Sequence, residues 1–156
     1  MKLELADLYY IPNFRFANGS TRDKYLLVLN HNNDNTIVLS LPTSKGRVPT
    51  HLEKGQFGCI NCDASLFNCY RFLNGVDITE DIPSFSFPLD TFLYGEWIQD
   101  WSSDTLKMDY SIEDVDYFFR GKLKRELLKD TLICFINSVK VKRKYKAIFK
   151  ELLNIL

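Results

Sequence analysis

The chain lacks the features that mark several large classes of protein. Its 156 residues have a formal net charge of zero and include only two histidines, four cysteines, five prolines and seven glycines. No apolar run approaches the roughly 18 residues of a membrane-spanning helix. Acidic residues within the first seven positions disfavour a secretory signal peptide. These absences predict a soluble, cytoplasmic protein with no membrane partner.

Motifs of the common hydrolases and nucleotide-binding proteins are also missing. The sequence contains no P-loop, no G-x-S-x-G elbow and no H-E-x-x-H zinc motif. One C-x2-C pair, Cys59 and Cys62, is flanked by His51 and Cys69, which leaves a zinc-stabilised structural domain open as an alternative. No second such pair follows, so small buried thiols, Cys134 included, in a reducing compartment are the default interpretation.

What the chain does have is apolar residues, which make up 46% of it, with 12 Phe, 8 Tyr and 2 Trp among them. This composition predicts one folded chain with a substantial core and excludes a disordered one. The charges are arranged in blocks: residues 77–116 carry eleven acids against Lys107 alone, and residues 117–150 carry eleven basic residues against Glu126 and Asp130. The two blocks either attract each other within the molecule or present solvated faces, or the basic block meets phosphates or an acidic partner.

The pattern predicts short strands first and helices last. Residues 8–11 form a β-favouring run that Pro12 is expected to stop. Residues 25–29 and 36–41 are apolar runs joined by the polar segment 30–35, which predicts an antiparallel hairpin whose first strand is buried on both faces. Residues 66–73 predict a further strand with one face partly exposed, because Asn68 and Arg71 interrupt it.

Later in the chain, the pattern changes to a helical one. Residues 76–105 show no helical period and predict loops with one or two short strands. Ser111 is a candidate N-cap, and Leu123, Leu127, Leu128, Leu132 and Phe135 recur at helical spacing before a last helical segment ending at Leu156. The expected class is therefore α+β, with a mainly β domain at 1–108, including an acidic connector, and a helical extension at 109–156 packed on it.

Candidate site residues gather at the open end of the predicted hairpin, away from its turn. Arg22 and Lys24 lie at the start of the first strand, and Thr43, Ser44 and Lys45 follow the second. In an antiparallel hairpin these ends lie side by side, so cations and hydroxyls would share one rim of the sheet. That combination suits a phosphodiester, whose transition state gains negative charge. The alternative is that the lysine only flanks a strand and the hydroxyls only cap a turn.

The two histidines are weaker candidates. A pair of histidines can act as general base and general acid on a phosphodiester. His31 lies in the polar segment between the hairpin strands and is expected to be solvated, whereas His51 follows Pro49 and Thr50 and is a candidate for substrate binding. A solvated turn histidine remains the alternative for each.

The order of these residues resembles the PemK/MazF-like toxin family over roughly residues 6–75. The family opens with a Gly-Asp strand, here Ala6-Asp7-Leu8-Tyr9-Tyr10, followed by a Gly-Ser loop, here Gly19-Ser20. A basic residue then enters an apolar strand (Lys24), the next strand ends at a threonine (Thr43), and a Pro-Thr-His segment follows at 49–51. The family has an arginine followed by proline where this chain has Lys24 and Tyr25.

The resemblance implies a fold and a function. The fold would be a small, bent SH3-like β-barrel, dimeric and cytoplasmic, followed here by C-terminal helices. The activity would be that of a metal-independent endoribonuclease without a cofactor, the toxin of a type II toxin–antitoxin pair, cleaving single-stranded RNA and bound by an antitoxin protein. Lys24 and Thr43 would be catalytic, and Arg22, Ser44, Lys45 and His51 would bind substrate. The alternative is an inactive barrel that binds protein or nucleic acid.

Overall fold

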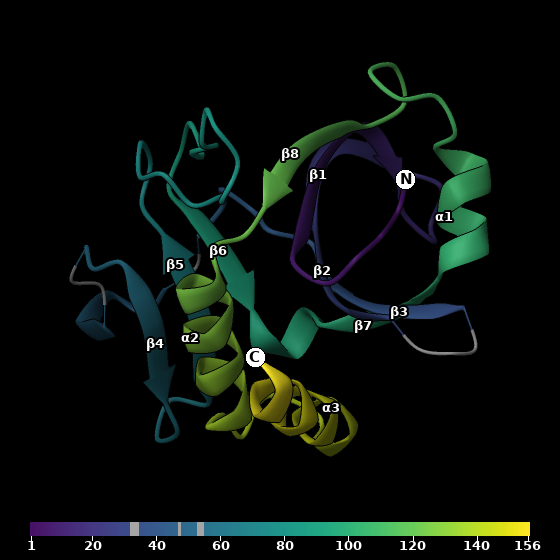
Figure 1. The fold of residues 1–156 in the computed structure, drawn as a ribbon. Coiled ribbons are helices and arrows are strands. Elements are labelled where there is room, and N and C mark those ends of the chain that lie inside the picture. Colours follow the sequence, from purple (N-terminus) through teal and green to yellow (C-terminus); the bar gives the residue numbers. More distant parts are fainter. Residues whose placement is uncertain (32–34, 47, 53–54) are drawn as a thin grey trace.

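The computed structural model describes residues 1–31, 35–46, 48–52 and 55–156, and the polar residues 32–34 of the predicted hairpin lie outside them. Within these residues the chain forms two antiparallel sheets and three α-helices (Figure 1). The larger sheet has the order β7 (Gln99–Ser102), β3 (Thr36–Ser40), β2 (Thr21–His31), β1 (Asp7–Arg15) and β8 (Phe118–Lys122). The smaller has the order β4 (Gly58–Cys62), β5 (Phe67–Phe72) and β6 (Thr91–Tyr94). The helices are α1 (Ser103–Asp109), α2 (Arg125–Ile136) and α3 (Arg143–Ile155), with short 3₁₀ turns η1 (Thr50–Leu52) and η2 (Gly95–Trp97).

The predicted α+β class is confirmed, but the expected closed barrel is not formed. The larger sheet curls strongly, as Figure 1 shows, and its edge strands are β7 and β8. No pairing among the described strands joins these two edges, so the sheet stays open. The remaining three strands form a separate sheet beside it rather than completing a barrel.

The predicted hairpin is confirmed, and it lies at the centre of the larger sheet. Strands β2 and β3 pair antiparallel, with Leu27 opposite Ser40 and Val28 opposite Leu39. Successive residues of β2 point to opposite faces, so Leu27 and Leu29 enter one hydrophobic core while Leu26 and Val28 enter the other. This burial on both faces explains the continuous apolar run in the sequence.

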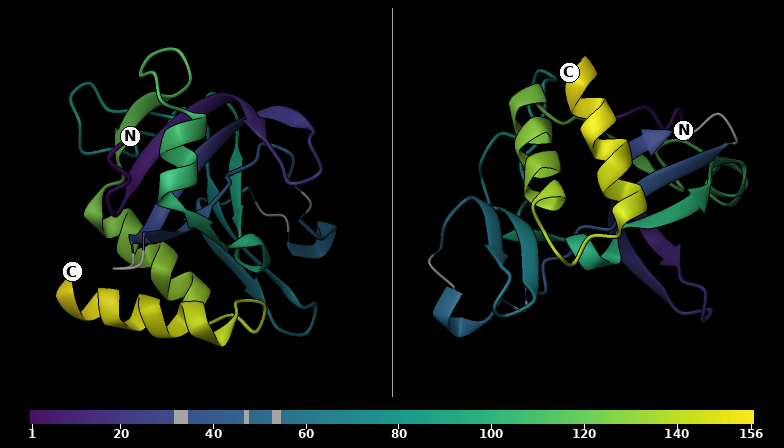
Figure 2. Two further views of the ribbon diagram at one scale, coloured as in Figure 1. Left: turned by 90° about the vertical axis from the view of Figure 1, so that its right-hand side faces the viewer. Right: turned by 90° about the horizontal axis from the view of Figure 1, so that it is seen from below.

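The two cores lie on opposite faces of the curled sheet. One lies inside the curl and is closed by α1 through Leu106 and Tyr110. The other fills the space between the larger sheet, the smaller sheet and the pair of helices α2 and α3. The views in Figure 2 show α3 lying alongside α2 at the C-terminal end of the molecule. No helix among the described residues is long and apolar enough to cross a membrane.

Strand β1 does not stop at Pro12, as the sequence had suggested, but runs through to Arg15. Its register against β2 shifts between Ile11 and Phe14, and Asn13 has a positive φ of 58°. A proline cannot donate to the sheet, and an irregularity of this kind is a place where that loss is tolerated. Strand β8 pairs with β1 only from Asp7 to Tyr10, so Pro12 needs no partner on that side.

Two other expectations about the later chain are wrong. Ser111 does not begin a helix: Asp116 Oδ2 accepts hydrogen bonds from the backbone N–H groups of Ser111 and Ile112 and closes a turn instead. The strand β8 then follows, within the segment expected to be helical. The helix missed by the sequence is α1, whose N-cap Ser102 accepts from the Thr105 N–H at 3.3 Å. The helices predicted from residues 123–135 and from the last segment are present as α2 and α3.

The cysteines are not all free thiols. Cys59 on β4 and Cys134 on α2 form a disulfide, which ties the smaller sheet to the helix packed on it. Cys62 and Cys69 are free, and burial raises the pKa of the Cys69 thiol to about 12. Since Cys59 is bonded to Cys134, the pair Cys59 and Cys62 cannot supply two thiolates to zinc. The described residues contain no cluster of three or more metal-ligating side chains.

Candidate functional site

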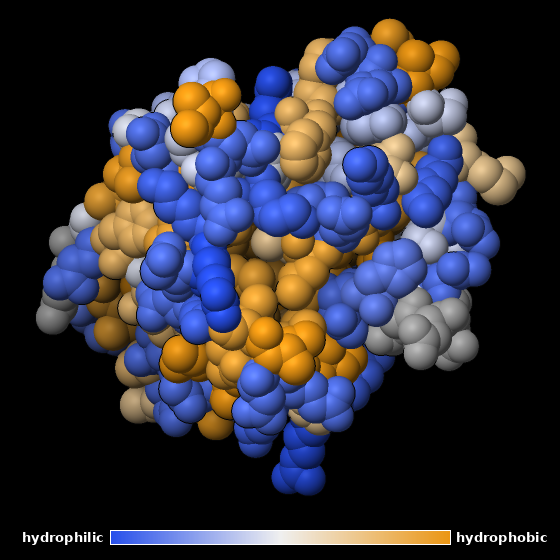
Figure 3. All heavy atoms as spheres, in the orientation of Figure 1, coloured by the Kyte–Doolittle hydropathy of each residue, from blue (hydrophilic) through white to orange (hydrophobic). Residues whose placement is uncertain are grey.

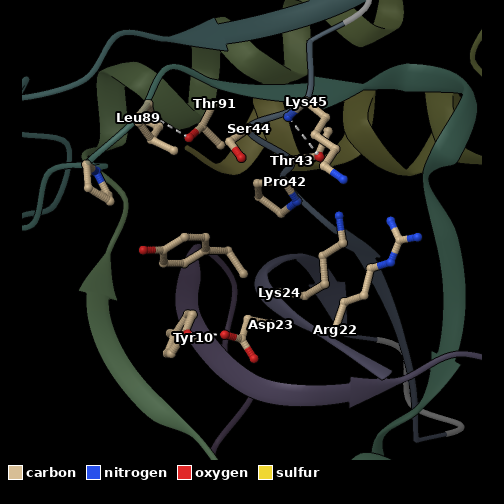
Figure 4. A pocket seen from close by; sticks show the side chains of 12 residues that line it. Tyr10, Arg22, Asp23, Lys24, Pro42, Thr43, Ser44, Lys45, Leu89 and Thr91 are labelled. Carbon is tan, nitrogen blue, oxygen red and sulfur yellow. Dashed lines mark hydrogen bonds between the residues drawn. The ribbon is translucent and has the colours of Figure 1, made fainter. Parts of the chain in front are cut away.

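The predicted rim of cations and hydroxyls lines a hollow of about 220 Å³. Five of the six expected site residues reach it, namely Arg22, Lys24, Thr43, Ser44 and Lys45. Figure 4 shows the side chains of Arg22 and Lys24 extending from β2 toward Thr43 and Lys45 on the opposite wall. We call this hollow the cation pocket.

The pocket exists because the hairpin opens at this end. Extending the register of Leu27 and Ser40 by three residues would place Thr43 opposite Lys24. Instead the pairing with β2 ends at Ser40, and Thr43 pairs with Phe92 of β6 through two backbone hydrogen bonds of 3.0 and 2.8 Å. On the β3 side the first residues of β2 therefore face a recess, whereas on the other side they still pair with β1. Thr43 is fixed at the junction of the two sheets.

The loop after Thr43 is held against the smaller sheet. Thr43 Oγ1 accepts a hydrogen bond of 3.2 Å from the Lys45 backbone N–H. Gly46 lies so close to the Phe92 ring that an added Cβ would stand 2.4 Å from it, which explains the need for glycine here. This packing keeps Ser44 and Lys45 at the mouth of the pocket.

The electrostatics of the pocket favour an anion. In the part of the chain that the structure describes, no ion pair includes Arg22, Lys24 or Lys45. Burial, and then the positive charges of Arg22 and Lys45, lower the pKa of Lys24 below its ordinary value of 10.5. A half-buried lysine whose pKa is lowered by burial and by two neighbouring cations marks a candidate functional site.

Several lining residues were missed by sequence reasoning. Asp23 lies between the two cations of β2, but its carboxylate accepts hydrogen bonds from the Tyr10 hydroxyl at 3.0 Å and the Asn13 N–H at 3.1 Å. Thr91 enters from the start of β6, where its hydroxyl donates to the Leu89 carbonyl at 2.8 Å. Tyr25 and Pro88 complete the walls. The pairing of Thr43 with Phe92 brings the start of β6, and with it Thr91, to the pocket. No local sequence pattern predicts this pairing.

The two histidines lie elsewhere. His51 is on the exposed turn η1, with Nε2 3.2 Å from the Ser65 hydroxyl oxygen, and it does not line the cation pocket. His31 ends β2, where its Nδ1 lies 3.4 Å from the Leu3 carbonyl oxygen. The structure therefore does not bring His51 to the residues with which the sequence grouped it.

A second hollow adjoins the first and shares two of its residues. Its volume is about 330 Å³, and Arg22 and Lys24 line both hollows. Trp97 on η2 and Phe16 supply its aromatic walls. We call it the tryptophan pocket.

The comparisons with known proteins add no relative to this description. No protein-family model, no curated protein and no solved structure matches the chain.

Proposed function

We propose that the protein is a metal-independent endoribonuclease that cleaves single-stranded RNA at the cation pocket. The observation that carries the proposal is that Arg22, Lys24 and Lys45, which form no ion pair among the described residues, line one pocket with Thr43. A phosphodiester brings one negative charge to the site in the ground state and a second during attack, so it gains most from such a cluster. The resemblance to PemK/MazF-like toxins, noted above, agrees with this choice of substrate.

In the proposed reaction the 2′ oxygen of one nucleotide attacks the adjacent phosphorus and the bond to the 5′ oxygen breaks. The 2′ hydroxyl gives its proton to water and the departing 5′ oxygen takes one from Lys24, which leaves a cyclic phosphate and a 5′ hydroxyl. Lys24 and Arg22 stabilise the pentacoordinate phosphorus, and Thr43 donates a hydrogen bond that positions a phosphate oxygen. Because its pKa is lowered, Lys24 is also better suited than an ordinary lysine to give a proton to the 5′ oxygen.

The test is RNA cleavage in EDTA by the full chain and two variants. Lys24→Ala should reduce the cleavage rate by about a hundredfold or more, since it removes a group that stabilises transition-state charge. Lys150→Ala is the matched control, because Lys150 is an exposed lysine of α3 that does not line the pocket. Mass spectrometry of the products should find cyclic phosphate ends. Equal cleavage by wild type and Lys24→Ala would remove the site assignment, and no cleavage by wild type would contradict the enzyme.

A second candidate function is binding without cleavage. It is favoured by the position of His51 outside the pocket and by a lysine at the place where the toxin family has arginine. A lysine offers one point charge, whereas an arginine offers a planar fork that grips two phosphate oxygens. Salt-sensitive RNA binding by an inert wild-type protein would identify this module.

The resemblance also suggests partners and a compartment. We propose a homodimer, an antitoxin protein that covers the site, and action in the cytoplasm, where RNA is found. Light scattering of the purified chain tests the dimer. A short neighbouring reading frame whose product binds the chain and blocks cleavage tests the antitoxin.

A further inference from the structure

The tryptophan pocket is built differently from the cation pocket beside it. Trp97 is 46% exposed, a large exposed fraction for an aromatic ring on a fixed turn. Phe16 and Leu41 add apolar surface, and the polar residues Asn18 and Gln99 line the same hollow. An exposed aromatic ring beside a positively charged pocket is the combination by which proteins hold an unstacked nucleobase.

The ring of Trp97 is held in place by its surroundings. It packs on Tyr94, with ring centroids 4.6 Å apart. Its turn begins at Gly95, where an added Cβ would stand 2.3 Å from Asn68 Oδ1 and 2.6 Å from a methyl group of Val141. This packing restricts the backbone of η2, and the contact with Tyr94 restricts the indole, which lowers the entropy cost of ordering the ring on binding.

The two hollows adjoin at Arg22 and Lys24, which line both. A nucleotide whose phosphate lies among these cations therefore has the tryptophan pocket next to it. Building on the proposed function, we propose that the tryptophan pocket binds one unstacked base of single-stranded RNA next to the phosphate in the cation pocket. Trp97 is the stacking surface, and the protein thereby selects single strands over duplexes.

The chain has two tryptophans, which makes the contact directly measurable. Trp101 packs on Phe14 with ring centroids 5.3 Å apart and does not line the tryptophan pocket, so Trp101→Phe keeps an aromatic ring in its place. In that variant Trp97 is the sole tryptophan, and a short single-stranded RNA made uncleavable by 2′-O-methyl groups should quench its fluorescence. In the matched variant Trp97→Phe, the remaining Trp101 should show no change.

Measuring the affinity of each variant for RNA and for a phosphate probe without a base distinguishes the base contact from the phosphate contact. Trp97→Ala should weaken binding of the uncleavable RNA by about five- to a hundredfold, the range measured for loss of one stacked base. The same variant should bind inorganic tripolyphosphate, which has no base, as wild type does, whereas Lys24→Ala should lose affinity for both probes. Circular dichroism melting of each variant confirms that it is folded.

The outcomes distinguish this inference from the proposed function on which it rests. Unchanged RNA affinity in folded Trp97→Ala, or equal affinity of wild type for duplex and single-stranded RNA, would overturn the base pocket and leave the cation pocket standing. Failure of wild type to bind either RNA or tripolyphosphate would overturn both.

Discussion

At the scale of one residue, the charge of Lys24 lowers the stability of the folded protein when the pocket is empty. Lys24 is half-buried, it has two cations as neighbours, and both burial and those neighbours lower its pKa below 10.5. Between that lowered pKa and 10.5 the unfolded chain holds a proton that the folded chain releases. The free energy of unfolding therefore rises with pH across this window, and the charged form of Lys24 destabilises the empty pocket. An anion bound among the cations would reverse this effect.

The lowered pKa of Lys24 predicts how RNA binding depends on pH. As pH rises from 7 to 10, wild type should lose the Lys24 charge earlier than it would lose that of an exposed lysine, and its affinity for RNA should fall with that charge. Lys24→Arg should keep its affinity over the same range, because a guanidinium stays protonated. The measurement is the Kd of an uncleavable single-stranded RNA at constant ionic strength. Identical pH profiles for the two proteins would contradict the assignment.

A second prediction concerns an ion pair near the pocket, between a buried arginine and a partly exposed carboxylate. The Arg71 side chain is only 8% exposed, contacts the Phe92 ring and pairs with Asp90 at 2.9 Å. Hydrogen bonds from the Asn74 backbone, from Arg71 and from the Asn74 side chain lower the pKa of Asp90 to about 2. Asp90→Ala should lower the free energy of unfolding by about 3–5 kcal/mol, because it leaves a buried guanidinium unpaired. Urea unfolding at pH 7 measures this loss.

The control for the ion pair is Asp109→Ala, an exposed acid at the end of α1, which should change stability by less than about 0.5 kcal/mol. Acid titration gives an independent check. The stabilisation from Asp90 is complete above the ordinary pKa of 3.8 and is lost as pH falls through about 2. Asp90→Ala should therefore lose less stability than wild type when the pH is lowered from 4 to 2. Equal losses would show that Asp90 does not carry this contribution.

At the scale of elements, the parts of the fold specified by local pattern were predictable from the sequence. The hairpin of β2 and β3 and the helices α2 and α3 follow from apolar runs and helical spacing. Contacts between distant segments were not predictable in this way. Asn68 and Arg71, expected on an exposed face, are buried because α2 covers one side of β5 and Asp90 pairs with Arg71 on the other. The residues of the cation pocket could be predicted because they lie at the start of β2 and just after β3, which belong to one hairpin. Thr91 and Trp97 come from distant segments of the chain, and only tertiary contacts bring them to the two pockets.

The disulfide between β4 and α2 gives a prediction at this scale. Cys59 and Cys134 are 75 residues apart in the sequence, so the bond restricts a long loop of the unfolded chain. Reduction should lower the free energy of unfolding by about 2–4 kcal/mol, measured by guanidinium unfolding with and without dithiothreitol. Cys62→Ala, which removes a free thiol, should keep the same difference between oxidised and reduced protein. A variant that lost the difference would show that Cys62 belongs to the bond.

Over the whole molecule, positive and negative charges are equal in number, but the cations differ in whether they form ion pairs. The acidic and basic blocks do meet: Lys144 pairs with Asp100 at 2.8 Å and Lys140 with Glu96 at 3.4 Å. Lys122 pairs with Asp7 and Glu4 near the start of the chain. The pairs of Lys144 and Lys140 are partly solvated and add little to stability, whereas the Asp7 carboxylate is buried. All of these pairs neutralise cations of the basic block. Figure 3 shows that apolar atoms gather where the C-terminus lies, with hydrophilic atoms around them, so the end of α3 does not form a uniformly basic surface.

The salt dependence of RNA binding can therefore separate the pocket from the basic block. Three cations that contact phosphates of a single strand should give a slope of about −2 in log affinity against log salt, at roughly −0.7 for each phosphate neutralised. Removing one pocket cation, as in Lys45→Ala, should make the slope shallower by about 0.7, because one fewer counterion is released. Lys150→Ala should leave the slope unchanged. A slope of about −5 that becomes shallower in Lys150→Ala would instead place the RNA along α3, and the three cations of the pocket would then not be the main phosphate contact.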